Sequence, residues 1–266
     1  MKEPQQELLS RLGFRFGING PHAARTMMLD DLRALLAHTQ ADATRAGYAT
    51  AIVTDNVLGK STKKARELAL RYLGALYGLE SSNAVFRALR RLWPLDESAQ
   101  PVLALAVALA RDPLLRSSQE FMLAQPQGGL VTREEVEALL SNNYPGRFTA
   151  ASIKSFAQNV AGTWTAAGVL VGHRRKTRSA PAVRPEAIAF LMFLGYLEGR
   201  TGQRLFSSEW MRLLGVSPDE LEALANSASH RGLLVFMSAG GVTEVRFPGY
   251  LTAEEERIRQ EVSHVI

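Results

Sequence analysis

The sequence LVTREEVEALLSNNYPGRFTAASIKSFAQNVAGTWTAAGVLVGHRRKTR, residues 130–178, decides the fold that we expect for this chain. Thr132 followed by Glu135 has the spacing of a capping box, which begins a first helix. The turn-favouring run NNYPG separates it from a second helix, for which Thr149 suits the N-cap. The β-branched, apolar run Val169–Val171 is typical of a strand. Strand, helix, turn, helix and strand in this order predict a winged-helix-like module.

The second helix of this module has an apolar face and a polar face. Apolar side chains recur at three- and four-residue steps from Ile153 to Trp164, so they share the face that packs inward. Lys154, Gln158 and Asn159 fall outside this stripe. We therefore expect these three polar side chains to face a ligand.

A basic run follows the predicted strand. His173, Arg174, Arg175, Lys176 and Arg178 stand together with no acidic residue between them. Residues 128–184 hold eight Lys and Arg against three Glu, a net charge of +5 that equals the net charge of the whole chain. A helix in the major groove beside a basic loop on backbone phosphate is how such modules bind DNA. The ordinary alternative is a solvated basic loop without a ligand.

Composition sets limits on the class of protein. With 266 residues, 46% hydrophobic and 21% charged, the chain is expected to fold as a soluble globular protein. The absence of cysteine excludes disulfides and thiolate metal sites and fits a reducing cytoplasm. The longest apolar runs, 101–110 and 187–197, fall short of the ~18–20 residues of a membrane span. The N-terminus has no apolar signal segment, so we expect a cytoplasmic protein without a membrane partner.

The N-terminal part, residues 1–125, is predicted to be a helical domain. Phe14, Phe16 and Ile18 alternate as in a strand within an N-terminal arm. Helices are expected over residues 21–46, from Ser61 or Thr62 to about 79, and over 83–92, 101–110 and 117–124. The helix at 101–110 has no polar face and must be buried. The run QPQGG at 125–129 predicts a linker to the winged-helix-like module at 128–184.

Gly59, Lys60, Ser61 and Thr62 invite comparison with a phosphate-binding loop. Such a loop requires a glycine where this chain has Thr54, so that backbone amides can wrap the phosphates. We therefore expect no nucleotide cofactor. Ser61 or Thr62 is predicted to cap the following helix, beside a basic edge able to touch phosphate.

The C-terminal part, residues 185–266, is predicted to be a second winged-helix-like module. Helices are expected over 186–199, 207–214 and from Ser217 to about His230, followed by a hairpin over 233–247 and a charged helix over 252–266. Residues 185–232 hold four basic and six acidic residues. Because carboxylates repel phosphate, this module is expected to pack against the first one or to bind a protein. The fold class is thus mainly α, with a helical bundle and two winged-helix-like modules with short β-hairpins.

No catalytic or metal-binding constellation is evident. The five histidines include no pair spaced i, i+4, and no nucleophile-elbow motif is present. Acidic residues at 134, 135 and 137 lie in the first turn of a helix, where the helix dipole favours them. We expect a protein that is not an enzyme, without cofactor, metal or small-molecule substrate. The candidate DNA-binding residues are Lys60, Lys63, Lys64, Arg147, Lys154, Gln158, His173, Arg174, Arg175, Lys176 and Arg178.

Two short motifs carry a resemblance to a known family. The run DNVLGKST at 55–62, followed by Ala65, Arg66 and Arg71, and the run LARDPLLR at 109–116 resemble the BrxA family of BREX phage-exclusion systems. The resemblance covers roughly residues 10–180. It implies an all-helical N-terminal part and a small, non-catalytic DNA-binding accessory protein of bacterial antiviral defence. The chain departs from the shorter family members by its extended C-terminal part.

Two classes of function remain open. The first is a component that binds double-stranded DNA and meets other defence-system proteins, with a transcriptional regulator as a variant. The second is a protein–protein scaffold or RNA-binding adaptor, whose basic regions touch another chain or RNA. The salt dependence of duplex binding discriminates between them, because phosphate contacts release counterions.

Overall fold

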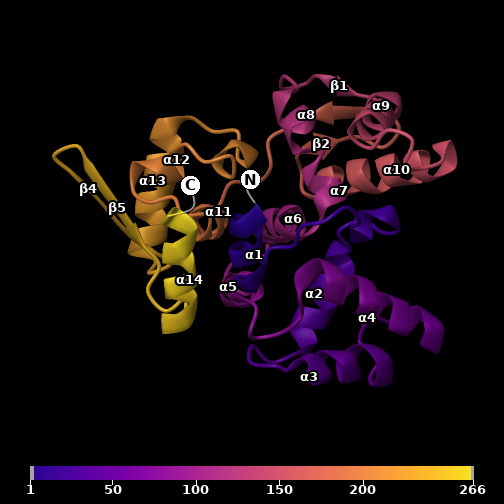
Figure 1. The fold of residues 1–266 in the computed structure, drawn as a ribbon, viewed down its shortest axis with the longest axis horizontal. Coiled ribbons are helices and arrows are strands. Elements are labelled where there is room, and N and C mark those ends of the chain that lie inside the picture. Colours follow the sequence, from indigo (N-terminus) through magenta and orange to yellow (C-terminus); the bar gives the residue numbers. More distant parts are fainter. Residues whose placement is uncertain (1–2, 265–266) are drawn as a thin grey trace.

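The structure, a computed structural model, describes residues 3–264 and is mainly helical (Figure 1). Two small antiparallel sheets accompany the helices, as the sequence predicted for the fold class. The predictions for residues 1–2 and 265–266, including the end of the last helix, lie outside the described residues. Within residues 3–264, no helix is both long and apolar enough to cross a membrane.

The N-terminal part contains helices α1 to α8 and two short turns of other helical types. They are α1 (Glu3–Arg11), η1 (Pro21–Ala23), α2 (Leu29–His38), α3 (Arg45–Ala49), the π-helical turn η2 (Thr50–Thr54), α4 (Lys63–Tyr77), α5 (Ala84–Leu92), α6 (Gln100–Arg111), α7 (Pro113–Arg116) and α8 (Gln119–Ala124). The hydroxyl of Thr62 caps α4 by accepting from Ala65 N, as predicted. Helix α6 is buried along almost its whole length, which confirms the expectation from its lack of a polar face.

Two expectations for the N-terminal part are wrong. The helix expected over residues 21–46 is broken, because Met28 takes a left-handed conformation with φ of 51° and turns the chain between η1 and α2. The N-terminal arm contains α1 in place of a strand. Phe14 and Phe16 do alternate, but in an irregular segment where their rings stack with centroids 6.3 Å apart.

The first winged-helix-like module has the predicted order. After α8 come β1 (Leu130–Val131), α9 (Arg133–Asn143), α10 (Ala150–Ala166), β2 (Leu170–Val171) and β3 (Lys176–Arg178). The sheet has the order β1-β3-β2, all antiparallel. The capping box of Thr132 and Glu135 is present, and the Thr149 hydroxyl caps α10 by accepting from Ser152 N. Part of the expected basic tip is therefore strand β3.

The C-terminal part repeats the order of helices followed by a hairpin. It contains α11 (Pro185–Leu197), α12 (Gln203–Phe206), the 3-10 turn η3 (Met211–Leu213), α13 (Pro218–His230), β4 (Val235–Ala239), β5 (Val242–Arg246) and α14 (Ala253–His264). The helix expected over 207–214 is wrong. Ser208 N and Met211 N donate to the carbonyls of Leu205 and Ser208, three residues back, so this segment makes tight turns without α-helical bonds.

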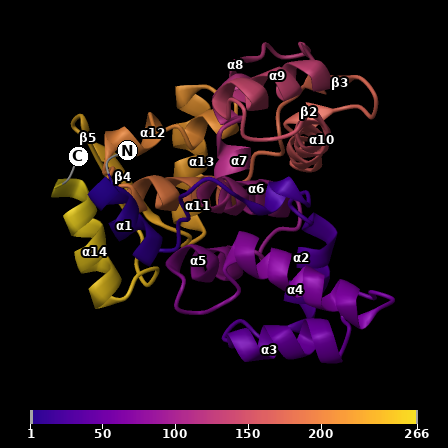
Figure 2. The same ribbon diagram turned by 45° about the vertical axis from the view of Figure 1, so that its right-hand side comes forward.

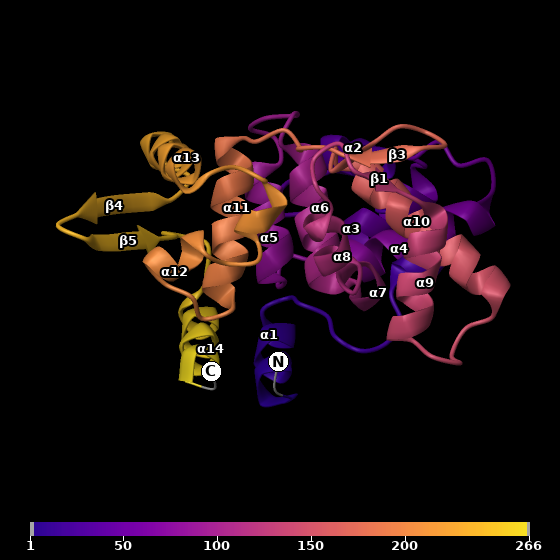
Figure 3. The ribbon, with the colours of Figure 1, turned by 90° about the horizontal axis from the view of Figure 1, so that it is seen from above.

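All three parts share one continuous hydrophobic core. Helix α6 packs on α11, and α1 from the N-terminal part packs on α14 from the C-terminal part (Figure 1). The hairpin β4-β5 projects from the body, as the view from above shows (Figure 3). Helix α10 and the small sheet lie at the opposite side of the molecule from this hairpin.

Candidate nucleic-acid interface

The position of helix α10 is fixed by its buried face. Ile153, Phe156 and Val160 point into the core, and Trp164 is fully buried with its Nε1 donating to Ser118 Oγ at 2.9 Å. On the opposite side, Lys154 and the neighbouring side chains of the first two turns are exposed. Helix α10 therefore presents a polar face from a rigid support, as a helix that enters a groove requires.

A buried polar network joins α10 to the N-terminal part. The Nδ1 of His22 lies 2.7 Å from Asp112 Oδ2, and its Nε2 lies 2.7 Å from Thr163 Oγ1 of α10. The same Asp112 oxygen accepts from His22 N at 2.7 Å, and Met27 N donates to Thr163 Oγ1 at 2.9 Å. These residue types resemble an acid–histidine–hydroxyl catalytic triad, yet His22, Asp112 and Thr163 are 0% exposed. The network holds α10 in place and has no surface for a substrate.

Asp112 is stabilised as a carboxylate despite its burial. Burial alone raises the pKa of Asp112, but hydrogen bonds and charge from His22, with a backbone bond from Leu115, outweigh it and place the pKa below its ordinary value. The other Asp112 oxygen, Oδ1, accepts from Leu114 N and Leu115 N and so caps α7. One carboxylate thus connects α7, η1 and, through His22, α10.

The loop between β2 and β3 forms the wing. Gly172 has φ of 101°, and a Cβ there would come 2.1 Å from Arg175 O, so this tight turn requires glycine. His173, Arg174 and Arg175 are exposed beyond the turn, and none of them forms an ion pair within residues 3–264. Lys176 Nζ donates to Thr165 Oγ1 of α10 at 2.8 Å. The base of the wing is thereby attached to α10.

Arg178, the last basic residue of the predicted tip, lies away from that surface. It is 5% exposed and donates through Nη1 to Val169 O at 3.2 Å and to Ser179 O. Burial lowers its pKa. Arg178 and Lys176 lie two residues apart in β3 and share one face of the strand, and the carbonyls of Val169 and Ser179 hold the Arg178 side chain in its buried position. The expectation that Arg178 faces a ligand is corrected by this placement.

The remaining predicted residues divide into paired and unpaired groups. Lys60 Nζ forms an ion pair with Asp31 Oδ1 at 2.7 Å, and Lys63 Nζ lies 4.0 Å from Glu67 Oε1. Lys64 is exposed and has no ion pair in the described part of the chain. Arg147 lies over the ring of Phe148 at 5.2 Å, beside the start of α10. Gln158 is exposed on the same helix, whereas Asn159 Nδ2 donates to His22 O.

Two arginines that the sequence analysis missed lie beside α10. The guanidiniums of Arg25 and Arg71 both lie over the ring of Tyr72, at 5.2 and 4.7 Å from its centroid. Thr26 follows Arg25 and touches α10, since a Cβ on Gly162 would come 3.2 Å from Thr26 Cγ2. Glu67 lies one helical turn before Arg71 but pairs with Lys63. The pairing of Arg25 and Arg71 depends on tertiary contact, so no local pattern reveals it.

These contacts define a cationic surface. It begins at the wing and reaches α10 where Lys176 donates to Thr165. From α10 it continues through the contact of Gly162 with Thr26 to the ring of Tyr72 in α4. Figure 2 shows β3, α10 and α4 along the same side of the molecule. No Asp or Glu occurs between Glu137 and Glu186. The cations of this surface, none with an ion pair among residues 3–264, are Arg25, Arg71, Lys154, Arg174, Arg175 and Lys176.

One solved structure has a similar fold. It is described as "SspB crystal structure", with a TM-score of 0.53 and 13% sequence identity, and the match covers 97% of this chain and 100% of that one. No family model and no curated protein matches. At 13% sequence identity, the similarity shows that the two chains share a fold. It includes the C-terminal part, which lies beyond the stretch that resembles the BrxA family.

Arg178→Ala is expected to lower stability without changing the phosphate contacts. The change removes hydrogen bonds from a charged donor to two carbonyls, which is expected to cost about 1.5–3 kcal/mol of unfolding free energy. Urea denaturation measures this loss, and DNA titration at several salt concentrations measures the contacts. A shallower salt dependence with unchanged stability would contradict the inward placement of Arg178.

Proposed function

We propose that this protein binds duplex DNA through the cationic surface, without catalysing a reaction. The observation that carries the proposal is the set of exposed cations Lys154, Arg174 and Arg175 beside the polar face of α10, in a stretch without acidic residues, and none of the three has an ion pair within residues 3–264. Unpaired cations along one surface neutralise a polyanion and release its counterions. The winged-helix order adds support, because the helix after the turn and the wing contact DNA in such modules.

The side chains on the exposed face of α10 predict that DNA binding depends only weakly on the base sequence. Its exposed face carries Lys154, Ser155 and Gln158, of which Gln158 is the residue suited to bidentate readout of adenine. Arg174 and Arg175 on the wing suit phosphate contacts, which position a protein on the duplex but carry no sequence information. We therefore expect the affinity for duplex DNA to depend mainly on contacts with its charged phosphate backbone. Strong enrichment of one motif from random duplexes would contradict this expectation.

The wider role that we propose is accessory DNA binding in a cytoplasmic BREX-type antiviral defence system. The motifs at 55–62 and 109–116 support this role by their resemblance to the BrxA family. The C-terminal module, with a net charge of −2 over residues 185–232, offers a surface better suited to another defence-system protein than to DNA. Phage plating on cells that carry the native operon tests this role. Loss of protection in the Arg174→Ala/Arg175→Ala strain is expected, and undiminished protection would contradict it.

Removal of the two wing arginines is expected to weaken duplex binding. If each arginine releases ~0.9 counterion, loss of two contacts lowers affinity roughly thirtyfold at ~0.15 M salt. Fluorescence anisotropy with a labelled duplex measures the change for Arg174→Ala/Arg175→Ala. The matched control is Arg246→Ala/Arg257→Ala, two exposed arginines of the C-terminal part that lie outside the cationic surface. Equal weakening in both variants would show that net charge, and not the wing, determines binding.

A further inference from the structure

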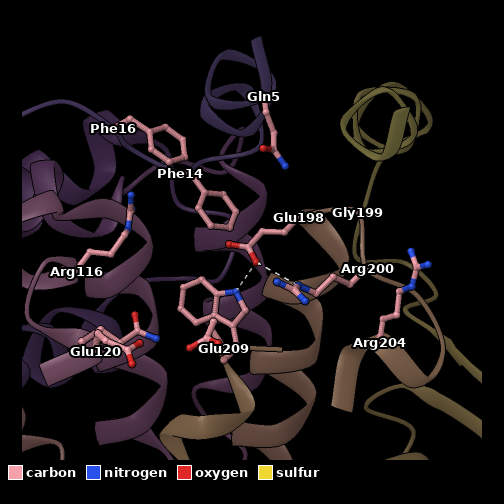
Figure 4. A pocket seen from close by; sticks show the side chains of 12 residues that line it. Gln5, Phe14, Phe16, Arg116, Glu120, Glu198, Gly199, Arg200, Arg204 and Glu209 are labelled. Carbon is pink, nitrogen blue, oxygen red and sulfur yellow. Dashed lines mark hydrogen bonds and ion pairs between the residues drawn. The ribbon is translucent and has the colours of Figure 1, made fainter. Parts of the chain in front are cut away.

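A second site lies between the N-terminal segment and the C-terminal part. A cavity of about 580 Å³ is lined by residues of α1 and the segment after it, of α7 and α8, and of the stretch from the end of α11 to Trp210 (Figure 4). Its size is within the range of small-molecule sites. None of the cations of the cationic surface lines this cavity. It is therefore separate from the proposed DNA interface.

Aromatic rings form one wall of the cavity. Phe14 and Phe16 stack with ring planes 6° apart, and Phe14 meets Trp210 edge to face with centroids 6.3 Å apart. Phe14 and Trp210 are 4% and 6% exposed, so the core holds their rings in place. Because so little of these two rings is exposed, a planar heterocycle would pack against their edges.

Glu198 supplies a carboxylate beside this wall. Its Oε2 accepts from Trp210 Nε1 at 3.0 Å and lies 4.0 Å from Arg200 Nε, while Oε1 has no hydrogen bond among the described residues. Burial raises the pKa of Glu198, and the bond from Trp210 and the charges of Arg200 and Arg116 offset this only in part. Because Oε1 has no donor in the described part of the chain, a ligand with adjacent N–H groups would stabilise the charged form of this carboxylate.

Two arginines stand at the other side of the carboxylate. Figure 4 shows Phe14 and Phe16 on one side of Glu198 and the side chains of Arg200 and Arg204 on the other. Arg204 is exposed and has no ion pair within residues 3–264. Guanidinium groups at the mouth of a site suit a phosphate. The cavity thus combines a surface for a ring, an acceptor for N–H donors and a cation for phosphate.

We propose that this cavity binds a free guanine mononucleotide. Guanine carries a ring N–H and an amino group side by side, and both can donate to the carboxylate of Glu198 while the ring lies against Phe14. Adenine presents an unprotonated ring nitrogen next to its amino group, which would face the carboxylate unfavourably. The 5′-phosphate would lie toward Arg200 and Arg204. No sequence motif marks the site, because its residues lie far apart in the chain.

Isothermal titration calorimetry of the full chain tests the proposal with GMP, AMP and guanosine. GMP is expected to bind at least tenfold more tightly than AMP, because a site built for paired donors rejects a ligand that lacks them. Glu198→Gln is expected to weaken GMP binding about tenfold to a hundredfold. The control Glu222→Gln removes a carboxylate that does not line the cavity and is expected to have no effect.

Arg204→Ala provides a second test that does not depend on Glu198. It should remove most of the preference for GMP over guanosine, and thermal melting should show that the exposed position tolerates alanine. Equal binding of AMP and GMP, or unchanged GMP affinity in Glu198→Gln, would overturn the proposal. The absence of GMP binding at millimolar concentration would also overturn the proposal. This holds even if a guanine-containing single strand of nucleic acid bound through Glu198.

Discussion

Replacing Asp112 with alanine is expected to lower the free energy of unfolding by about 3–5 kcal/mol, the usual cost of removing one partner of a buried charged network. The change leaves His22 without its acceptor and removes the cap of α7. It also loosens the connection to Thr163, so α10 should lose protection against hydrogen exchange. Urea denaturation measures the stability, and amide exchange of α10 measures the local effect.

The control for this substitution is Asp30→Ala. Asp30 pairs with Arg33 through a side chain that is 97% exposed, and such surface pairs contribute little. We expect the control to unfold at nearly the same urea concentration as the wild type. A similar loss of stability in both variants would contradict the role assigned to the buried network.

The effect of Asp112→Ala should also depend on pH. The pKa of Asp112 is lower in the folded chain than its ordinary value of 3.8, so the unfolded chain takes up the proton first as pH falls. The stabilisation by Asp112 is therefore fully present above that ordinary value and is lost as pH falls through the folded-state pKa. The stability difference between wild type and variant should be largest near neutral pH and narrow below about pH 4. A difference that widens in acid would contradict this assignment.

Trp164→Ala is expected to destabilise the chain by a comparable amount. Removing a fully buried tryptophan leaves a cavity beside α10 and costs about 3–5 kcal/mol. Trp164→Phe keeps most of the buried ring but loses the hydrogen bond to Ser118 Oγ, so its cost should be smaller. Thermal melting of both variants measures the difference. A phenylalanine variant as unstable as the alanine variant would show that the hydrogen bond matters more than the packing.

Local signals in the sequence predicted much of the fold. The capping boxes at Thr132 and Ser217 are present, and each begins a helix at the predicted residue. The wholly apolar runs became the buried helices α6 and α11. These features are set by hydrogen bonds within one turn or by the burial of a whole segment, so neighbouring residues suffice to reveal them.

Other features depend on distant contacts and could not be predicted in this way. The alternation of Phe14 and Phe16 resembled a strand, but these residues have no partner strand and pack against Arg116 and Trp210 instead. The helix expected over residues 21–46 was too long at both ends, because Met28 adopts positive φ before α2 and α2 ends at His38. In each case tertiary packing determined the conformation.

The candidate site was predicted in part. Lys154, Arg174 and Arg175 are exposed as expected, and the base of the wing contacts α10 where Lys176 donates to Thr165. Arg178 follows in the same basic run but is buried, because its guanidinium donates to the carbonyls of Val169 and Ser179. Arg25 and Arg71 join the surface through the ring of Tyr72, a tertiary contact that the sequence did not indicate.

The salt dependence of duplex binding tests the cationic surface most directly. Binding constants of the wild type, Arg174→Ala/Arg175→Ala and Arg25→Ala/Arg71→Ala would be measured over a series of salt concentrations. Each pair of lost contacts is predicted to make the slope of log affinity against log salt shallower by about 2. The control Arg246→Ala/Arg257→Ala should keep the wild-type slope. Slopes that do not change in the wing and Arg25/Arg71 variants would contradict a DNA interface on this surface.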